Sequence, residues 1–164
     1  MGKIFEVRGF SLIETLIVVG VIGIISIVVF SNLFTRSNRA ALDSTVLQMV
    51  ATLREAQSRS AAGENSAAWG VRFDNTTGTA PFYALFRTSY TSQNTAGYYR
   101  LPPDVNYATS SIAQGSSVEI TFSKISGIPS ATSSITLNLT RGVATGAVAT
   151  SATITVNSTG LISF

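Results

Sequence analysis

Glu14 is the first residue whose chemistry stands out, because it is the only formal charge in the apolar run from Phe10 to Phe30. An ionisable group inside such a run costs about 2.5 kcal/mol or more unless it finds a partner. We therefore expect the carboxylate of Glu14 to have a partner that compensates its charge. The alternative is that Glu14 lies near enough to a helix start to reach water and favour the N-terminal dipole.

Catalytic chemistry has few candidate residues in this chain. It contains no histidine and no cysteine, which removes Ser-His-Asp triads, thiolate nucleophiles and Cys/His zinc sites. Lys124 has no activating base or sign of a pocket near it that would make a Ser/Lys hydrolase. Asp74 and Asp104 lie near turns without an acidic cluster, so turn capping is a better interpretation than calcium binding. We expect neither an enzyme nor a cofactor or metal site.

Three arginines are interleaved with the aromatic residues between Trp69 and Tyr107, namely Arg72, Arg87 and Arg100. This composition is a candidate stacking surface for single-stranded DNA. The net charge is +3, but the basic residues are scattered singly, whereas electrostatic binding of DNA normally needs a clustered basic footprint. A sandwich core with tyrosines at its rim is the better interpretation, so we do not expect nucleic acid as a partner. The aromatic residues expected in that core are Trp69, Phe73, Phe82 and Phe86.

The length of the apolar run indicates what kind of element carries Glu14. About 21 residues at about 1.5 Å each span roughly 30 Å, the thickness of the hydrocarbon core of a bilayer. A secretory signal peptide is disfavoured, because its apolar region is about 7 to 15 residues long and ends at a small-residue cleavage site. A plain membrane anchor and a helix that continues into a head remain. We expect residues 10–30 to form a transmembrane and assembly helix.

A helical period continues beyond this run. Apolar residues recur at intervals of three and four, with charged residues mostly on the other faces. We expect residues 31–62 to be an amphipathic continuation of the helix that stops at Gly63. The apolar positions are Leu42, Val46, Met49, Val50, Leu53 and Ala56.

After Gly63 the pattern changes to alternation in segments rich in Val, Ile, Phe, Tyr and Thr, separated by turn residues. Residues 67–164 are therefore expected to form a β-rich globular head, and the Ala/Thr/Ser/Gly-rich tract 140–152 a loop or poor strand. The expected strands are Ala68–Phe73, Phe82–Arg87, Tyr98–Leu101, Val118–Phe122, Ile135–Leu139, Thr153–Val156 and Leu161–Phe164. The predicted fold class is α+β, with a long N-terminal helix packed against a small antiparallel β-sandwich-like head.

The segment Gly9-Phe10-Ser11-Leu12-Ile13-Glu14, followed by the aliphatic run, resembles the prepilin signature of type IV pilins and type II secretion pseudopilins. The resemblance covers residues 1 to about 35. It implies that residues 1–9 are a leader, that prepilin peptidase cuts after Gly9, and that the new amine of Phe10 is N-methylated. It also implies that Glu14 pairs with the Phe10 amine of a neighbouring subunit, and that the fold is the pilin fold.

Two further stretches resemble the GspH/FimT group of minor pseudopilins and minor pilins. They are LREAQSRSAAGENSAAWGVRFD from Leu53, and ITFSKISGIPSATSSITLNLT with the later ITVNSTGLIS. The chain departs from that group in lacking a run of basic residues where Ser58 to Glu64 stand. The resemblance implies a structural subunit of a type II secretion pseudopilus or type IV pilus-like filament; the alternative is a FimT-like minor pilin that acts as a DNA receptor or adhesin at the filament tip.

The same resemblance implies where such a subunit would be found and what it would meet. The expected location is the bacterial inner or cytoplasmic membrane, crossed once with the head outside the cytoplasm, and then a cell-surface or periplasmic filament. The expected partners are prepilin peptidase, other pilin or pseudopilin subunits, and membrane lipid before assembly.

Overall fold

The computed structural model describes residues 11–139 and 151–164, and it describes no side chain of residues 27–38. The expected leader 1–9, the cut site at Gly9 and Phe10, and most of the expected loop 140–152 lie outside the described residues. The chain divides into two compact units, Met1–Arg36 and Ser37–Phe164. Each unit is described by itself below.

One helix, α1, covers Leu12–Ala61. It ends where Gly63 adopts a left-handed conformation with φ of 64°, which glycine reaches without the steric cost of a Cβ atom. A short 3-10 turn, η1, follows at Glu64–Ser66. The last turns of α1 carry an ion pair between Arg59 and Glu55 at 2.6 Å, and the Arg59 guanidinium also lies 4.6 Å from the ring centre of Trp69. The stop at Gly63 coincides with the one expected from the sequence.

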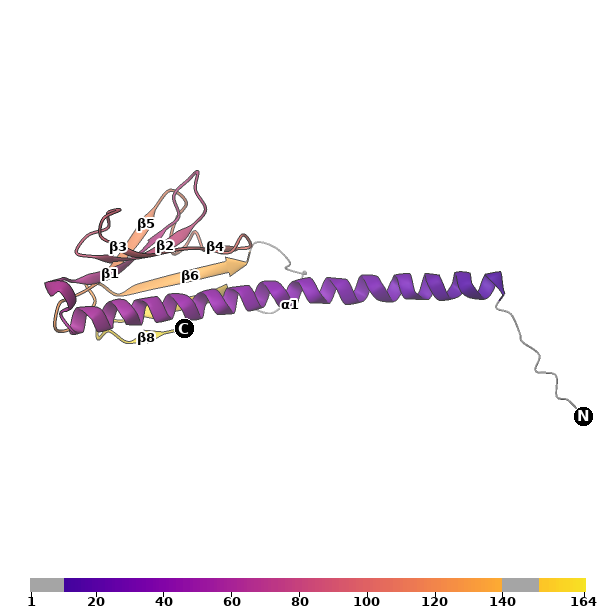
Figure 1. Ribbon diagram of the computed structural model, residues 1–164, viewed down its shortest axis with the longest axis horizontal. Coiled ribbons are helices and arrows are strands. Elements are labelled where there is room, and N and C mark those ends of the chain that lie inside the picture. The colour runs from indigo at the N-terminus through magenta and orange to yellow at the C-terminus, as the bar shows by residue number, and fades with distance from the viewer. Residues whose placement is uncertain (1–10, 140–150) are drawn as a thin grey trace, which may run out of the picture. The chain divides into compact units, whose positions relative to one another are not determined.

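Among the described residues eight strands follow α1 (Figure 1), and all paired strands are antiparallel. One four-stranded sheet has the order β3-β2-β1-β5 and the other the order β4-β6-β7-β8. The strands are β1 (Trp69–Asp74), β2 (Phe82–Arg87), β3 (Thr95–Arg100), β4 (Val105–Tyr107), β5 (Ser117–Phe122), β6 (Ser133–Leu139), β7 (Ser151–Val156) and β8 (Ile162–Ser163).

The core of the second unit is a single hydrophobic cluster shared by both sheets and by the later part of α1. The helix contributes the apolar positions that the three- and four-residue spacing singled out, each no more than 2% exposed. From the two sheets come residues such as Val71, Phe73, Ile120, Leu137 and Ile154, all nearly inaccessible to water. Burial of these side chains is the dominant favourable term that holds the helix on the sheets.

The predicted pilin-like fold class is wrong for the part of the chain that the structure describes. Within α1, side chains are described for residues 12–26 and 39–61, and the boundary between the two compact units lies between these two stretches. The structure supports these helical stretches and eight strands in two antiparallel sheets. It does not support a transmembrane half-helix joined to a head.

No helix is both long enough and apolar enough to cross a membrane among the described residues. The expected span 10–30 includes residue 10, which lies outside the described residues, and residues 27–30, whose side chains are not described. The predicted transmembrane helix and the single-pass inner-membrane location that followed from it are therefore corrected.

Strand β2 has the expected bounds, those of β1, β5, β6, β7 and β8 differ by one or two residues, and β3 and β4 differ more. The short strand β4 was not predicted, because Val105-Asn106-Tyr107 is too short to show an alternating pattern and becomes a strand through its pairing with β6. Strand β3 begins at Thr95, three residues before the expected start, because its first residues pair with β2 although they are not strongly apolar. Both differences arise from partners that are distant in sequence.

Candidate functional site

The first described stretch of α1 presents an apolar surface that no described residue covers. We name it the N-terminal apolar surface. Its large side chains are between 50% and 82% exposed, and they face every direction around the helix because they occupy most positions of the stretch. They are Leu12, Ile13, Leu16, Ile17, Val18, Val19, Val21, Ile22, Ile24 and Ile25. A helix that is apolar all round requires an apolar environment on all sides.

Four residues of this stretch frame a shallow hollow with a volume of about 320 Å³. They are Leu12, Thr15, Leu16 and Val19, which stand at positions i, i+3, i+4 and i+7 of the helix. Four residues at this spacing form the hole that accepts a side chain of a second helix in knobs-into-holes packing. Gly20 and Gly23 follow with open space where a Cβ atom would stand, so another backbone can approach there closely.

Glu14 lies in the first turn of α1 and is exposed. Its amide nitrogen and that of Thr15 donate to the Ser11 carbonyl at 3.0 and 3.2 Å, which closes the first turn. None of the ion pairs found among the described residues includes Glu14. Its expected partner is the Phe10 amine of a neighbouring subunit, and Phe10 lies outside the described residues.

The hydroxyl groups of the stretch are engaged locally. Thr15 donates to the Leu12 carbonyl at 2.8 Å, and Ser26 donates to the Ile22 carbonyl at 2.7 Å. Such bonds satisfy the hydroxyl within its own helix. These side chains therefore offer no reactive nucleophile.

The three arginines proposed for DNA are separated by the fold. Residues paired across antiparallel strands place their side chains on one face of the sheet. Arg72 pairs with Ala84 and Arg100 with Phe82, on the outer face, whereas Arg87 pairs with Trp69, whose side chain belongs to the core. Arg87 is the last residue of β2, whereas Arg100 lies on β3 opposite Phe82, the first residue of β2. The structure does not bring these three cations together.

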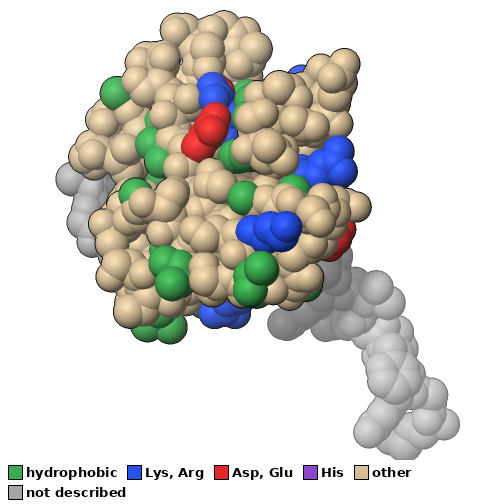
Figure 2. All heavy atoms as spheres, turned by 90° about the vertical axis from the view of Figure 1, so that its left-hand side faces the viewer, with side chains coloured by type: hydrophobic (Ala, Val, Ile, Leu, Met, Phe, Trp, Pro, Cys, Tyr) green, Lys and Arg blue, Asp and Glu red, His purple; other side chains and the backbone are tan. Residues whose placement is uncertain are grey.

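Arg72 is moreover neutralised where it stands. It contacts the carboxylates of Asp74 at 2.8 Å and Glu119 at 2.6 Å, and its guanidinium lies 4.8 Å from the ring centre of Tyr90. Burial opposes the charged form of Arg72, but the hydrogen bonds with Glu119 and Asp74 outweigh it and raise the pKa of Arg72. Figure 2 shows the Lys and Arg side chains of the face in view as separate spots, without a continuous basic patch.

Asp74 is likewise occupied in structural contacts. Burial by itself would raise its pKa, but hydrogen bonds from Thr76 and Arg72 hold the pKa below its ordinary value. The Thr76 hydroxyl and amide both donate to the Asp74 carboxylate, as in an Asx turn. No group of three or more metal-ligating side chains exists in the described ranges. Turn capping by Asp74 is what the structure shows.

The aromatic residues of the head lie partly where the sequence predicted. Trp69 and Phe73 belong to the shared core, whereas Phe82 and Phe86 are buried on the other face of β2, against Tyr90. Two tyrosines expected at the rim, Tyr83 and Tyr107, are instead almost fully buried in the core. Sequence reasoning missed them because a tyrosine on an alternating strand reads equally well as core or rim.

Comparison with known proteins gives no relative for this chain: no family model, curated protein or solved structure matches it.

Proposed function

We propose that this chain is a structural subunit of a filament of the type II secretion pseudopilus or type IV pilus-like kind, similar to a GspH-like minor pseudopilin. In this proposal the N-terminal apolar surface packs against the same surface of neighbouring copies or related subunits. The observation that carries the proposal is the exposure of ten large aliphatic side chains, each at least 50% accessible, on one short helical stretch. Burial of each such side chain contributes about 1.5–3 kcal/mol.

The shape of the stretch supports helix-to-helix packing in particular. The hollow framed by Leu12, Thr15, Leu16 and Val19 has the spacing of a knobs-into-holes site, and Gly20 and Gly23 permit close approach of a second backbone. Aliphatic side chains that surround the helix can contact several neighbours at once, as a filament core requires. A simple dimer would cover one side of the helix alone.

In this proposal Glu14 sets the axial register between neighbouring helices. Within a packed bundle its carboxylate needs a cation, and the resemblance of Gly9 to Glu14 to the prepilin signature indicates the amine that prepilin peptidase would free at Phe10. A stagger that pairs the two charges is favoured over other staggers, because an unpaired charge in an apolar core is costly. Prepilin peptidase and sibling subunits are thus the proposed partners.

Cysteine cross-linking tests the proposal directly, since the chain has no cysteine of its own. The variant Leu16→Cys should form disulfide-linked dimers when the full chain is expressed together with its assembly machinery and then oxidised. The matched variant Gln93→Cys, on an exposed turn of the head, should not. Adding Glu14→Gln to Leu16→Cys should lower the cross-linked fraction about tenfold, because the stagger loses about 1.4 kcal/mol or more.

Asp43→Asn serves as the control for charge. Asp43 is an exposed acid of the second helical stretch, and its neutralisation in the Leu16→Cys background should leave the dimer band unchanged. A Leu16→Cys chain that stays monomeric under oxidation would contradict helix-mediated assembly. Equal cross-linking with and without Glu14→Gln would contradict the role of Glu14 in setting the register, but not assembly through the helix.

A further inference from the structure

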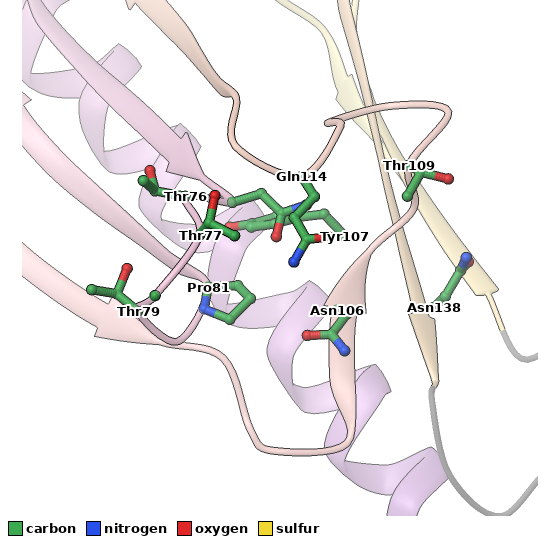
Figure 3. Close-up of a pocket in the computed structure, with 11 residues that line it drawn as sticks. Thr76, Thr77, Thr79, Pro81, Asn106, Tyr107, Thr109, Gln114 and Asn138 are labelled. Atoms are coloured by element: carbon green, nitrogen blue, oxygen red, sulfur yellow. The ribbon is translucent and has the colours of Figure 1, made fainter.

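The second unit contains a cavity of about 430 Å³ where the two sheets meet their connecting loops. Its walls are the turn 75–79 between β1 and β2, Pro81, strand β4, the loop 109–114 and the end of β6. Figure 3 shows these segments around the cavity, with Thr77 and Thr79 on the turn, Gln114 on the loop and Asn106 on β4. The volume lies within the range usual for small-molecule sites.

The wall of this cavity is held in place before any ligand arrives. The Asn75 side chain donates to the Ile112 carbonyl at 2.9 Å, and the Asn75 carbonyl accepts from the Gly115 amide at 2.8 Å. These bonds tie the 75–79 turn to the 109–115 loop. At the base, the buried Tyr107 donates its hydroxyl to the Phe82 carbonyl at 2.9 Å. A prearranged wall lowers the entropic cost of binding.

The lining is uncharged, and most of its residues are of polar type. No Lys, Arg, Asp or Glu lines the cavity. Three amides and three hydroxyls of the lining make no side-chain hydrogen bond among the described residues. They are the side chains of Asn106, Gln114, Asn138, Thr77, Thr79 and Thr109.

These properties select the class of ligand. An anion or a cation would find no compensating charge, and an apolar ligand would strip water from six polar groups without replacing their hydrogen bonds. Amide and hydroxyl groups each donate and accept, as the hydroxyls of a sugar do. We propose that this cavity binds a neutral saccharide, with Asn106 and Gln114 as the principal hydrogen-bonding residues.

The neighbouring sheet face provides room for a chain of sugars rather than a single one. Asn106 pairs across strands with Asn138, and Asn138 pairs with Ser151, so their side chains share one face. On the same face the hydroxyls of Thr136 and Thr153 lie 3.0 Å apart. This uncharged polar row leads away from the cavity across β4, β6 and β7. A peptide is disfavoured, because grooves that bind peptides use apolar pockets for alternate side chains.

Calorimetric titration of the purified full chain tests this inference, which is independent of filament assembly. The chain is kept in a detergent without a sugar headgroup, and the probes are the neutral trisaccharides cellotriose, maltotriose and triacetylchitotriose. We expect saturable binding of at least one probe. Asn106→Ala and Gln114→Ala should each weaken it about tenfold, since each removes hydrogen bonds to the ligand.

Gln93→Ala is the matched control, because it removes an exposed amide from a turn that does not line the cavity. It should bind like the unaltered chain, and circular dichroism should show all three variants folded. No binding of any probe up to about 10 mM, equal binding by Gln114→Ala, or a preference for a carboxylated trisaccharide would overturn the inference. Binding of an extended peptide at these residues in place of the sugars would overturn it as well.

Discussion

Tyr83 and Tyr107 are both buried in the core, yet their hydroxyl groups differ in one respect. The Tyr107 hydroxyl donates to the Phe82 carbonyl at 2.9 Å. The Tyr83 hydroxyl has no hydrogen-bond partner in the described structure; Thr52 lies near enough to affect its pKa, but its own hydroxyl donates to the Gln48 carbonyl. A buried polar group without a partner lowers the free energy of unfolding.

Removal of each hydroxyl should therefore have opposite effects on stability. Tyr83→Phe keeps the rings stacked with Phe73 and Tyr99 and should raise the free energy of unfolding by about 1 kcal/mol. Tyr107→Phe should lower it by about 1 kcal/mol, because a satisfied bond is lost. Urea unfolding of both variants measures the difference. A loss of stability in Tyr83→Phe would mean that its hydroxyl has a partner.

The same two tyrosines should make the head sensitive to alkali. Burial is the main cause that raises the pKa of each above its ordinary value, with a neighbouring tyrosine, Tyr99 for Tyr83 and Tyr83 for Tyr107, adding to it. A raised folded-state pKa gives stability that is fully present below the unfolded pKa of about 10 and is lost as pH rises above it.

Urea unfolding between about pH 9 and 12 checks this expectation. Each buried tyrosine should reduce the free energy of unfolding by about 1.4 kcal/mol per pH unit once the unfolded chain ionises. The double variant Tyr83→Phe with Tyr107→Phe should show a correspondingly flatter pH profile. An unchanged slope would show that these groups ionise alike in the folded and unfolded states.

At the scale of elements, side chains at the C-terminal end of α1 form hydrogen bonds with the head. Gln57 donates to the carbonyls of Gly127 and Gly160 at 3.2 and 3.0 Å, which joins two turns distant in sequence. Ser60 is fully buried, and its hydroxyl accepts from the Trp69 amide at 2.8 Å at the start of β1. These bonds set the direction in which the first strand leaves the helix.

Ser60→Ala should lower the free energy of unfolding by about 1–3 kcal/mol, because the Trp69 amide is left buried without an acceptor. Ser58→Ala changes an exposed serine of the same helical turn whose hydroxyl makes no bond in the described structure, and it should shift stability by less than about 0.5 kcal/mol. Thermal unfolding of the pair measures the contrast. Equal melting temperatures would contradict the anchoring role of Ser60.

Elements with a strong local pattern could be predicted, whereas those made by pairing could not. Strand β2 has the bounds expected from Phe82 to Arg87, since six residues of apolar and β-forming character specify a strand by themselves. Strand β4 and the first residues of β3 lack such a pattern and are strands because β6 and β2 offer partners. The candidate cavity could not be predicted either, because its walls come from segments that are separate in sequence.

At the scale of the whole molecule, every residue of the hydrophobic core belongs to the unit Ser37–Phe164. A fragment of residues 37–164 should therefore unfold in one cooperative transition, and its far-ultraviolet circular dichroism should lack only the helical signal of residues 12–36. It should also remain monomeric where the full chain associates, because it lacks the N-terminal apolar surface. Sedimentation and urea unfolding check both expectations.

Two results with this fragment would contradict these expectations. A fragment that unfolds without cooperativity would show that residues 1–36 contribute to the core. A fragment that associates as strongly as the full chain would locate self-association in the head, and would count against assembly through α1.

The amino-acid sequence by itself determined the helical faces, the strong strands, the isolated acid at position 14 and the absence of histidine and cysteine chemistry. These follow from periodicity and residue type, which act over a few neighbouring positions. Tertiary structure decided the strand pairing, the burial of Tyr83 and Tyr107, the dispersal of the three arginines and the cavity beside Asn106. Each of these depends on which distant segments meet, and that is set by burial of the shared core rather than by any local pattern.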